Sequence, residues 1–317
     1  MDETVIILGA NGQIGTELAA ALRNKYGAQN VIVTDIREPE HLEENVIFHQ
    51  QDVLDKNAVE ELFAKYKPTQ VYLMAAMLSA TAEKFPQKAW DLNMTSLLHV
   101  LDLAVKMNIR QVFWPSSIGA FGPNSPRENT PQYCTMDPQT IYGISKLAGE
   151  RLCEYYHRKY GLDVRSIRYP GLISWKTIPG GGTTDYAIHI YQEALDKGSY
   201  ECFLSENTEL PMLYMDDAIR ATLELMSAPA ENLRVRSSYN LGGLSFTPKD
   251  VAENIRKEIS DFEISYTEND PRQAIADSWP KSIEDTYAQE DWGWKPKFSL
   301  QDVTKIMLEN LTPTSQK

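Results

Sequence analysis

The sequence has few cysteines, no long apolar run and no excess of positive charge, and each absence excludes a class of protein. Cysteine occurs three times in 317 residues, at Cys134, Cys153 and Cys202. This odd number and wide spacing fit neither a disulfide framework nor a metal site, so we expect no metal and reduced thiols in a cytoplasmic protein. No stretch approaches the roughly 18 apolar residues of a membrane-spanning helix, so we expect no membrane association.

Acidic residues outnumber basic residues by 44 to 31, which gives a formal net charge of −13 at pH 7. Because nucleic acids and anionic membranes attract basic surfaces, this balance argues against both as partners. We interpret the charge as a contribution to solubility. With 42% hydrophobic and 24% charged residues, the composition is that of a globular protein with a sizeable core.

Short apolar runs alternate with amphipathic stretches through the first 170 residues. The apolar runs predict strands at 4–9, 30–35, 46–51, 70–75, 111–116 and 163–169. The stretches between them predict helices at 13–26, 55–66, about 83–107 and 140–160. This alternation is typical of an α/β fold with a doubly wound parallel sheet and helices on both faces.

The pattern changes after Pro170. A glycine-rich loop follows, and beyond it the only predicted strand is at 237–241. Helices are predicted at 185–197, 216–227 and 248–259, and residues 260–317 are mixed and rich in aromatic side chains. We therefore expect a smaller α/β lobe at the C-terminal end, beside the first sheet.

A glycine motif links the first predicted strand to the first predicted helix. It reads Gly9-Ala-Asn-Gly12-Gln-Ile-Gly15, one residue wider than the common dinucleotide-binding fingerprint. Glycines at this junction allow a tight turn and a close approach of the backbone to a pyrophosphate, which the helix N-terminus attracts. A bare strand-to-helix turn is the alternative, but the flanking strand and helix favour dinucleotide binding.

Two acidic residues follow the next two strands. Asp35 can accept hydrogen bonds from the adenosine ribose hydroxyls and would repel a 2′-phosphate, which favours NAD over NADP, although the nearby Arg37 weakens that preference. Asp52 has two interpretations: it could contact the adenine amino group, or it could be the N-cap of the helix that starts near Asp55.

The candidate chemistry lies in Tyr142-Gly-Ile-Ser-Lys146 and in the serines at the end of the fifth strand. Tyr142 and Lys146 share one face of a helix, so the ammonium, together with the nicotinamide cation, can favour the phenolate form of the tyrosine. Strand ends in an open parallel sheet border the ligand crevice, which places Ser116 and Ser117 beside it. The alternatives are an ordinary surface pair for the tyrosine and lysine, and a polar strand cap for the serines.

Together these motifs resemble the extended short-chain dehydrogenase/reductase family over nearly the whole chain. The resemblance implies that Ser117, Tyr142 and Lys146 are catalytic, and that Asn93 has a structural role. Phe121 departs from the family, which has tyrosine at this position. From the motifs and the resemblance, the expected NAD-binding residues are Gly9, Asn11, Gly12, Gln13, Ile14, Gly15, Asp35, Arg37, Asp52, Val53, Leu73, Ala75, Ala76, Asn93, Ser116, Tyr142, Lys146 and Tyr169.

Three departures from the sugar-nucleotide members of this family narrow the substrate. The fifth strand is not followed by the carboxylate pair of the dehydratases, and Leu210 stands where the epimerases carry a phosphate-binding arginine. The third is the polar loop Gly180-Gly-Gly-Thr-Thr-Asp-Tyr-Ala187, whose backbone amides and hydroxyls suit a small carboxylate.

These motifs resemble one branch of the family, the epimerase-like L-threonine 3-dehydrogenases. That resemblance implies NAD-dependent oxidation of the C3 hydroxyl to 2-amino-3-ketobutyrate, with Tyr142 as general base. It also implies substrate contacts from Ser79, Ser117, Tyr142, Thr184 and Trp279. Ser79 could instead be a turn serine, and Trp279 a core aromatic.

Two other functions remain open from the sequence: a sugar-nucleotide 4-epimerase, and a non-catalytic NAD-binding sensor. The resemblance further implies a homodimer that packs through helices near 85–107 and 140–160. The expected domains are an NAD-binding Rossmann domain and a substrate lobe. The first comprises residues 1–170 with the chain returning at about 211–243, and the second comprises 171–210 and 244–317.

Overall fold

Seven parallel strands form the central sheet of the protein. The computed structural model describes residues 3–39, 45–177 and 180–313. Within them the strand order is β3-β2-β1-β4-β5-β6-β10, and every pair is parallel. The strand bounds are β1 Val5–Leu8, β2 Val31–Asp35, β3 Ile47–Gln50, β4 Gln70–Leu73, β5 Gln111–Ser117, β6 Asp163–Tyr169 and β10 Tyr239–Asn240. The predicted doubly wound sheet is confirmed, and its order reverses between β1 and β4, where such sheets bind ligands.

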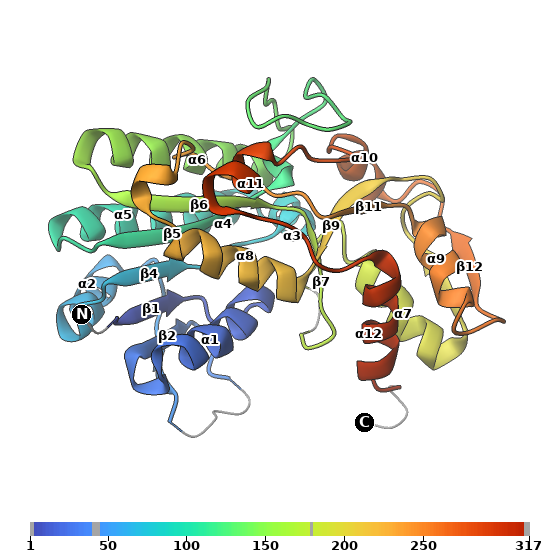
Figure 1. Ribbon diagram of the computed structural model, residues 1–317, viewed down its shortest axis with the longest axis horizontal. Helices are drawn as coiled ribbons and strands as arrows, with labels where there is room; N and C mark the ends of the chain where they lie inside the picture. The colour runs from blue at the N-terminus through green and yellow to red at the C-terminus, as the bar shows by residue number, and fades with distance from the viewer. Residues whose placement is uncertain (1–2, 40–44, 178–179, 314–317) are drawn as a thin grey trace.

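Helices cover both faces of this sheet (Figure 1). Along β1, Val5 and Ile7 pack into the core formed with α1 and α8, whereas Ile6 and Leu8 pack into the core formed with α2, α5 and α6. Side chains alternate between the faces of a strand, so a fully apolar strand is buried on both sides. The helix bounds are α1 Gln13–Tyr26, α2 Lys56–Tyr66, α5 Ser96–Lys106, α6 Ile141–Tyr160 and α8 Met215–Ser227.

The helix predicted at 83–107 is instead a series of shorter elements. These are α3 Ser79–Lys84, α4 Pro86–Trp90, the π-helical turn η2 Asp91–Thr95 and then α5. The break falls at Phe85, whose φ of −137° and ψ of 62° are not helical. The residue before a proline is disfavoured in the α conformation, so Pro86 ends one helix and begins the next.

A second group of elements lies beside the carboxyl ends of the parallel strands, on the right of Figure 1. Its sheets are β11-β9-β7 and β12-β8, and its core includes Tyr186, Tyr191 and Phe246. The bounds are β7 Gly171–Ile173, α7 Tyr186–Lys197, β8 Ser199–Cys202, β9 Leu210–Tyr214, β11 Leu244–Phe246, α9 Pro248–Arg256, β12 Glu263–Tyr266, α10 Pro271–Asp277 and α12 Leu300–Asn310. These five strands were not predicted. Two of them, β8 and β12, alternate exposed polar residues with buried or half-buried ones and so lack a continuous apolar run.

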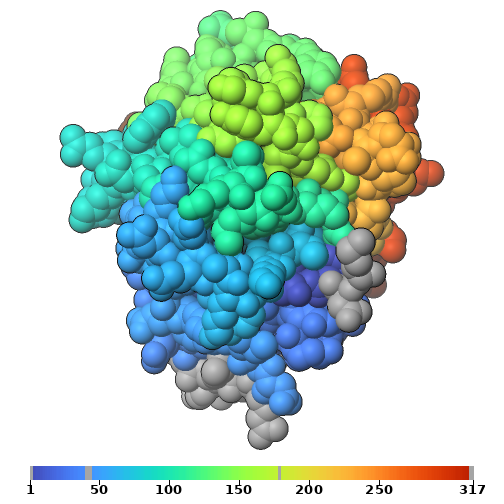
Figure 2. Space-filling view, turned by 90° about the vertical axis from the view of Figure 1, so that its left-hand side faces the viewer, coloured from blue at the N-terminus to red at the C-terminus, as the bar shows by residue number. Residues whose placement is uncertain are grey.

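One late segment returns to the first core. Helix α11, Thr286–Trp292, contacts β10, and Ala288 and Trp294 pack with the side chains between the sheet, α1 and α8. The face drawn in Figure 2 is built almost entirely by the first 170 residues, and the orange segment near 230–240 lies at its right margin. Among the described residues, no helix is long and apolar enough to cross a membrane.

Candidate functional site

The three glycines between β1 and α1 occupy different environments. Gly9 has a φ of +88°, and a Cβ on it would lie 2.4 Å from the backbone nitrogen of Ala75. A Cβ on Gly15 would lie 2.5 Å from the carbonyl oxygen of Gly9, so this glycine lets helix and strand pack closely. Gly12 is open: the nearest heavy atom to its Cβ position is 3.8 Å away. The protein itself therefore needs Gly9 and Gly15, whereas only a bound ligand would need Gly12.

The N-terminus of α1 carries unused hydrogen-bonding capacity. No side chain caps it, so its first N–H groups face the space in front of Gly12. The side-chain nitrogen Nε2 of Gln13, the first helical residue, is buried and has no hydrogen-bond partner among the described residues. An orphaned donor beside a free helix N-terminus suits an anionic ligand.

Asp35 is oriented by two backbone N–H groups at the carboxyl end of β2. Its carboxylate accepts from Asn11 at 3.0 Å and from Arg37 at 3.1 Å. Asn11 in turn donates its side-chain amide to the carbonyl of Arg37 at 2.7 Å. This arrangement holds the two turns after β1 and β2 together at the edge of the crevice.

The N-cap interpretation of Asp52 is wrong. Helix α2 begins at Lys56, and its cap is Asp55, whose carboxylate accepts from the backbone N–H of Ala58. The carboxylate of Asp52 instead accepts from the N–H of Leu54 at 2.9 Å. The adenine contact of Asp52 stays a prediction.

The apolar residues predicted to bind the cofactor lie partly in the core and partly beside the glycine turn. Leu73 and Val53 are buried in the core between the sheet, α2 and α5, whereas Ala75 donates its backbone N–H to Leu8 and lies against Gly9. Ala76 and Ile14 are partly exposed. The predicted apolar residues are therefore divided between the core and the crevice wall.

Asn93 joins two segments of the predicted site through its side chain. Its side chain accepts from the N–H of Met77 at 2.9 Å and donates to Ser145 at 3.2 Å. Ser145 donates to the carbonyl of Tyr142 at 2.7 Å. Asn93 thus ties the chain after β4 to the first turn of α6.

Ser117, Tyr142 and Lys146 are brought together by β5 and α6. The Ser117 hydroxyl accepts the N–H of Gly119 at 3.1 Å and interacts with the Tyr142 hydroxyl. Lys146 donates to the carbonyl of Pro115 at 2.6 Å, and its ammonium lies 5.5 Å from the centre of the Tyr142 ring. Thr140 caps α6 through the N–H of Gly143, which fixes where this helix starts.

Burial dominates the protonation behaviour of Tyr142 and Lys146 in the chain without cofactor. Burial raises the pKa of Tyr142, although the hydrogen bond with Ser117 opposes the rise. Burial also lowers the pKa of Lys146, from 10.5 to about 7. In the chain alone, desolvation is the largest influence on both groups, and it favours the neutral form of each.

Two predicted cofactor ligands have hydroxyls that are already engaged. Ser116 donates to the buried Glu150 at 2.7 Å, and Glu150 is paired with Arg168. The Tyr169 hydroxyl bonds to Thr222 on α8. The contacts of both hydroxyls are thus within the protein.

The glycine-rich loop after β7 meets the N-terminus of α3. The hydroxyl of Ser79 lies 3.2 Å from that of Thr183, a residue that the sequence analysis missed although it adjoins the predicted Thr184. Thr184 packs against Gly171, where a Cβ would lie 2.7 Å from the threonine Cγ2. The loop therefore brings Thr183 next to the predicted substrate residue Ser79, whereas its neighbour Thr184 packs against Gly171.

The expectation that the amides of this loop receive a substrate carboxylate is wrong for two of them. The carboxylate of Asp185 accepts the N–H groups of Gly181 at 2.9 Å and Gly182 at 2.7 Å. Trp279 is 4% exposed and belongs to the core of the second group of elements, as in its alternative interpretation. Among the described residues, no three or more His, Cys, Asp or Glu side chains are grouped to hold a metal.

The sheet order, the glycine turn and the serine–tyrosine–lysine group define a Rossmann-type nucleotide-binding protein. Residues 5–242 match the sequence profile of the NAD dependent epimerase/dehydratase family. The chain belongs to this family, and NAD is its cofactor. The open approach to Gly12, the uncapped α1 and the free amide of Gln13 fit the diphosphate of this cofactor.

Its relatives include named dehydrogenases. The mitochondrial L-threonine 3-dehydrogenase of Sus scrofa is 47% identical over 96% of this chain and 81% of its own length. The holo form of the GalE-like L-threonine dehydrogenase of Cupriavidus necator is 53% identical, with a TM-score of 0.95 over 98% of this chain and 100% of that one. The UDP-glucose 4-epimerase of Thermotoga maritima is more distant, at 25% identity and a TM-score of 0.84 over 97% of this chain and 98% of that one.

Proposed function

We propose that this protein oxidises the C3 hydroxyl of L-threonine to a ketone with NAD as the oxidant. The observation that carries the proposal is the contact between Ser117 and Tyr142, with Lys146 on the same helix face, in a chain about half identical to named L-threonine dehydrogenases. In this proposal Ser79, Thr184 and the unanticipated Thr183 hold the substrate, and Trp279 supports the pocket from the core behind it.

The proposed mechanism uses the chain's residues for proton transfer and orientation. Ser117 hydrogen-bonds the C3 hydroxyl, and Tyr142 takes its proton as general base. NAD, when bound, supplies the hydride acceptor. The product is 2-amino-3-ketobutyrate. Because the chain alone raises the pKa of Tyr142, the phenolate requires the positive charge of the cofactor in addition to that of Lys146.

We further propose the cofactor roles from the geometry of each residue. Gly12, Gln13 and the first turn of α1 receive the diphosphate, and Asp35 receives the ribose hydroxyls. Asp52 faces the adenine, and Asn93 supports the wall of the crevice. Ser116 and Tyr169 contribute through their backbone and ring surface, because their hydroxyls bond to Glu150 and Thr222.

The epimerase alternative lacks a phosphate clamp. Leu210 is fully buried in the apolar core of the second group of elements, so the position of the epimerase arginine holds no charge toward a ligand. The sensor alternative does not account for the grouping of Ser117, Tyr142 and Lys146. We therefore favour the dehydrogenase.

The substrate is tested by NADH formation from L-threonine, L-serine, L-threonine amide and UDP-glucose. L-Threonine is expected to react best, and L-serine about 10–200-fold less efficiently, because a methyl group in an apolar slot contributes about 1–3 kcal/mol. Threonine amide is expected to be poor because it lacks the carboxylate charge. Because 4-epimerisation forms no net NADH, UDP-glucose is tested in addition for conversion to UDP-galactose. That conversion without oxidation of threonine would replace the proposal with the epimerase.

Replacing Gly12 by alanine is expected to weaken NAD binding without destabilising the fold. The added Cβ meets nothing closer than 3.8 Å in the protein, so the methyl group competes only with the ligand. We expect at least a tenfold rise in the NAD dissociation constant, about 1.4 kcal/mol, with an unchanged melting temperature. The matched variant Gly15→Ala is expected to lower the melting temperature, because its Cβ meets the Gly9 carbonyl at 2.5 Å. Equal melting temperatures for the two variants would contradict this division.

Replacing Asp35 by serine is expected to change the choice of cofactor. The carboxylate lies at the end of β2, where it can accept ribose hydroxyls and repel a 2′-phosphate. The ratio of kcat/KM for NAD to that for NADP is expected to fall in Asp35→Ser. An unchanged ratio would show that Asp35 only orients the Asn11 turn.

We also propose the organisation and location of the protein. The NAD-binding domain comprises residues 1–170 and about 211–243, and the packing of α11 adds residues 286–294 to it. The substrate lobe comprises residues 171–210 and the rest of 244–317. A homodimer through α4–α6 is supported by exposed apolar side chains on these elements and just before α4, namely Phe85, Trp90, Leu98 and Ile144. Three free thiols are in keeping with a cytoplasmic location.

A further inference from the structure

A buried carboxylate joins the helix of the glycine turn to the segment that precedes the glycine-rich loop. Glu17 lies on α1, and its side chain is 6% exposed. Its carboxylate accepts a hydrogen bond from the Ser174 hydroxyl and another from the Lys176 ammonium at 3.0 Å. Both partners come from the residues that follow β7.

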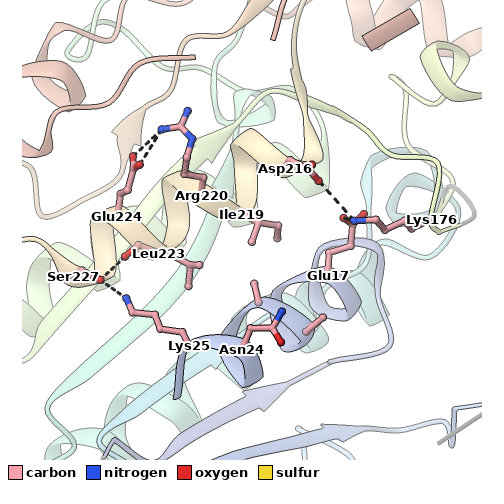
Figure 3. Close-up of a pocket in the computed structure, with 12 residues that line it drawn as sticks. Glu17, Asn24, Lys25, Lys176, Asp216, Ile219, Arg220, Leu223, Glu224 and Ser227 are labelled. Atoms are coloured by element: carbon pink, nitrogen blue, oxygen red, sulfur yellow. Dashed lines mark hydrogen bonds and ion pairs between the residues drawn. The ribbon is translucent and has the colours of Figure 1, made fainter. Parts of the chain in front are cut away.

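The lysine also contacts a second helix. Its ammonium lies 3.7 Å from a carboxylate oxygen of Asp216 in the first turn of α8, and its backbone N–H donates to Ser174 at 3.1 Å. Figure 3 shows Lys176 between Glu17 and Asp216 at one end of the groove between α1 and α8. The segment after β7 is thus attached to two helices that pack on the sheet.

Beyond this segment, the glycine-rich loop has its own contacts with α3. Thr183 bonds to Ser79, and a Cβ on Gly181 would lie 2.9 Å from the Thr81 hydroxyl. The loop is therefore attached to α1 and α8 before it and to α3 within it. Without the first attachment, the loop would keep its contacts with α3 and the packing of Thr184 against Gly171.

Glu17 depends on this attachment for its hydrogen bonds. A buried carboxylate that loses its partners incurs a large desolvation cost, so detaching the segment is opposed by the charge left behind on α1. The same carboxylate lies one helical turn from the glycine turn, where the cofactor is proposed to bind. An attachment placed there can hold the substrate loop in register with the cofactor.

We propose that Glu17, Ser174 and Lys176 are positioning residues, a latch that holds the glycine-rich loop against the cofactor helix in the orientation that the substrate requires. The kinetic part of this proposal rests on the proposed function, which assigns Ser79, Thr183 and Thr184 to substrate binding. The latch touches neither the reacting atoms nor the diphosphate site. Its loss therefore affects the loop and the Michaelis constant for the amino acid more than the binding of NAD.

The test compares Lys176→Met and Glu17→Gln with two matched controls in the same groove. Lys25→Met removes one positive charge at the opposite end, where Lys25 contacts Ser227. Glu224→Gln removes one negative charge from the pair with Arg220. Lys176→Arg keeps the charge and serves as the rescue variant.

The first readout is hydrogen exchange of residues 180–187 in the full chain with NAD and without amino acid. We expect exchange about 5- to 30-fold faster in Lys176→Met and Glu17→Gln, the range that a modest local destabilisation produces, and wild-type exchange in both controls and in Lys176→Arg. The second readout is kinetic. The Michaelis constant for L-threonine is expected to rise about tenfold or more, with the NAD dissociation constant within about twofold of wild type.

The outcomes separate the latch from the proposed function. Unchanged loop exchange in the folded Lys176→Met variant overturns the latch, whatever Glu17→Gln does to stability. Faster exchange with an unchanged Michaelis constant for threonine overturns the positioning role and leaves a structural ion pair. If wild-type protein does not oxidise threonine, the proposed function fails, and the exchange experiment still decides whether Glu17 and Lys176 hold the loop.

Discussion

The variant Tyr142→Phe is expected to lose turnover almost completely while it retains NAD. The substitution removes only the hydroxyl, the group that contacts Ser117 and that we propose as proton acceptor. General base catalysis contributes about 10²- to 10⁴-fold, so kcat is expected to fall by at least that range. The measurement is NADH formation from saturating L-threonine, together with NAD titration of the same preparation.

The control for this variant is Tyr156→Phe, on the same helix. The Tyr156 hydroxyl bonds to Asp102. Its loss is expected to leave kcat within about twofold, since it removes a single hydrogen bond outside the proposed site. If Tyr142→Phe kept activity within tenfold of wild type, the proton would have another acceptor and the assignment of Tyr142 would be incorrect.

The variant Lys146→Met is expected to stabilise the protein without cofactor and to abolish turnover. Burial lowers the pKa of Lys146 from 10.5 to about 7, which corresponds to about 5 kcal/mol against the charged form in the folded chain. Methionine removes that cost but leaves the Pro115 carbonyl without its donor, which costs about 1–3 kcal/mol. The net expectation at pH 6.5 is a gain of about 2–4 kcal/mol in the free energy of unfolding.

The stability gain of Lys146→Met depends on pH, because the folded and unfolded chains bind the lysine proton with different pKa values. Below pH 7 both folded and unfolded chains carry the protonated lysine, so the wild-type chain bears the full cost. Between pH 7 and 10.5 the unfolded chain binds more protons than the folded chain, and wild-type stability rises with pH. The advantage of Lys146→Met is therefore expected to shrink as urea titrations move from pH 6.5 to 9.5. If the advantage of Lys146→Met stayed constant over this pH range, the pKa of Lys146 in the folded chain would not be near 7.

The parts of the fold that could be predicted are those that have a local signal. Helix α1 begins and ends where the periodicity of residues 13–26 predicted, and α6 lies within one residue of its predicted start because Thr140 caps it and Gly161 ends it. Strand β6 matches the predicted 163–169. In each case one stretch of chain carries both the apolar pattern and its end signals.

The predictions that failed required knowledge of contacts elsewhere in the chain. The amides of Gly181 and Gly182 suit a carboxylate, but Asp185 of the same loop supplies it, which a motif cannot reveal without the loop's conformation. Asp52 does not cap α2, because the helix begins at Lys56 and its cap is therefore Asp55. Strands β8 and β12 of the second lobe each carry two exposed polar positions among four residues, so they lack the continuous apolar run that marks β1.

The amino-acid sequence by itself determined the doubly wound sheet, the glycine turn at its reversal point and the spacing of Tyr142 and Lys146, because each is written in neighbouring residues. Only the tertiary structure decided which groups meet across the crevice. Ser79 and Thr183 are 104 residues apart, and Glu17 and Lys176 are 159 apart. Their contacts, like the lowered pKa of Lys146, depend on how the two parts of the chain pack and exclude water. No local pattern encodes that packing.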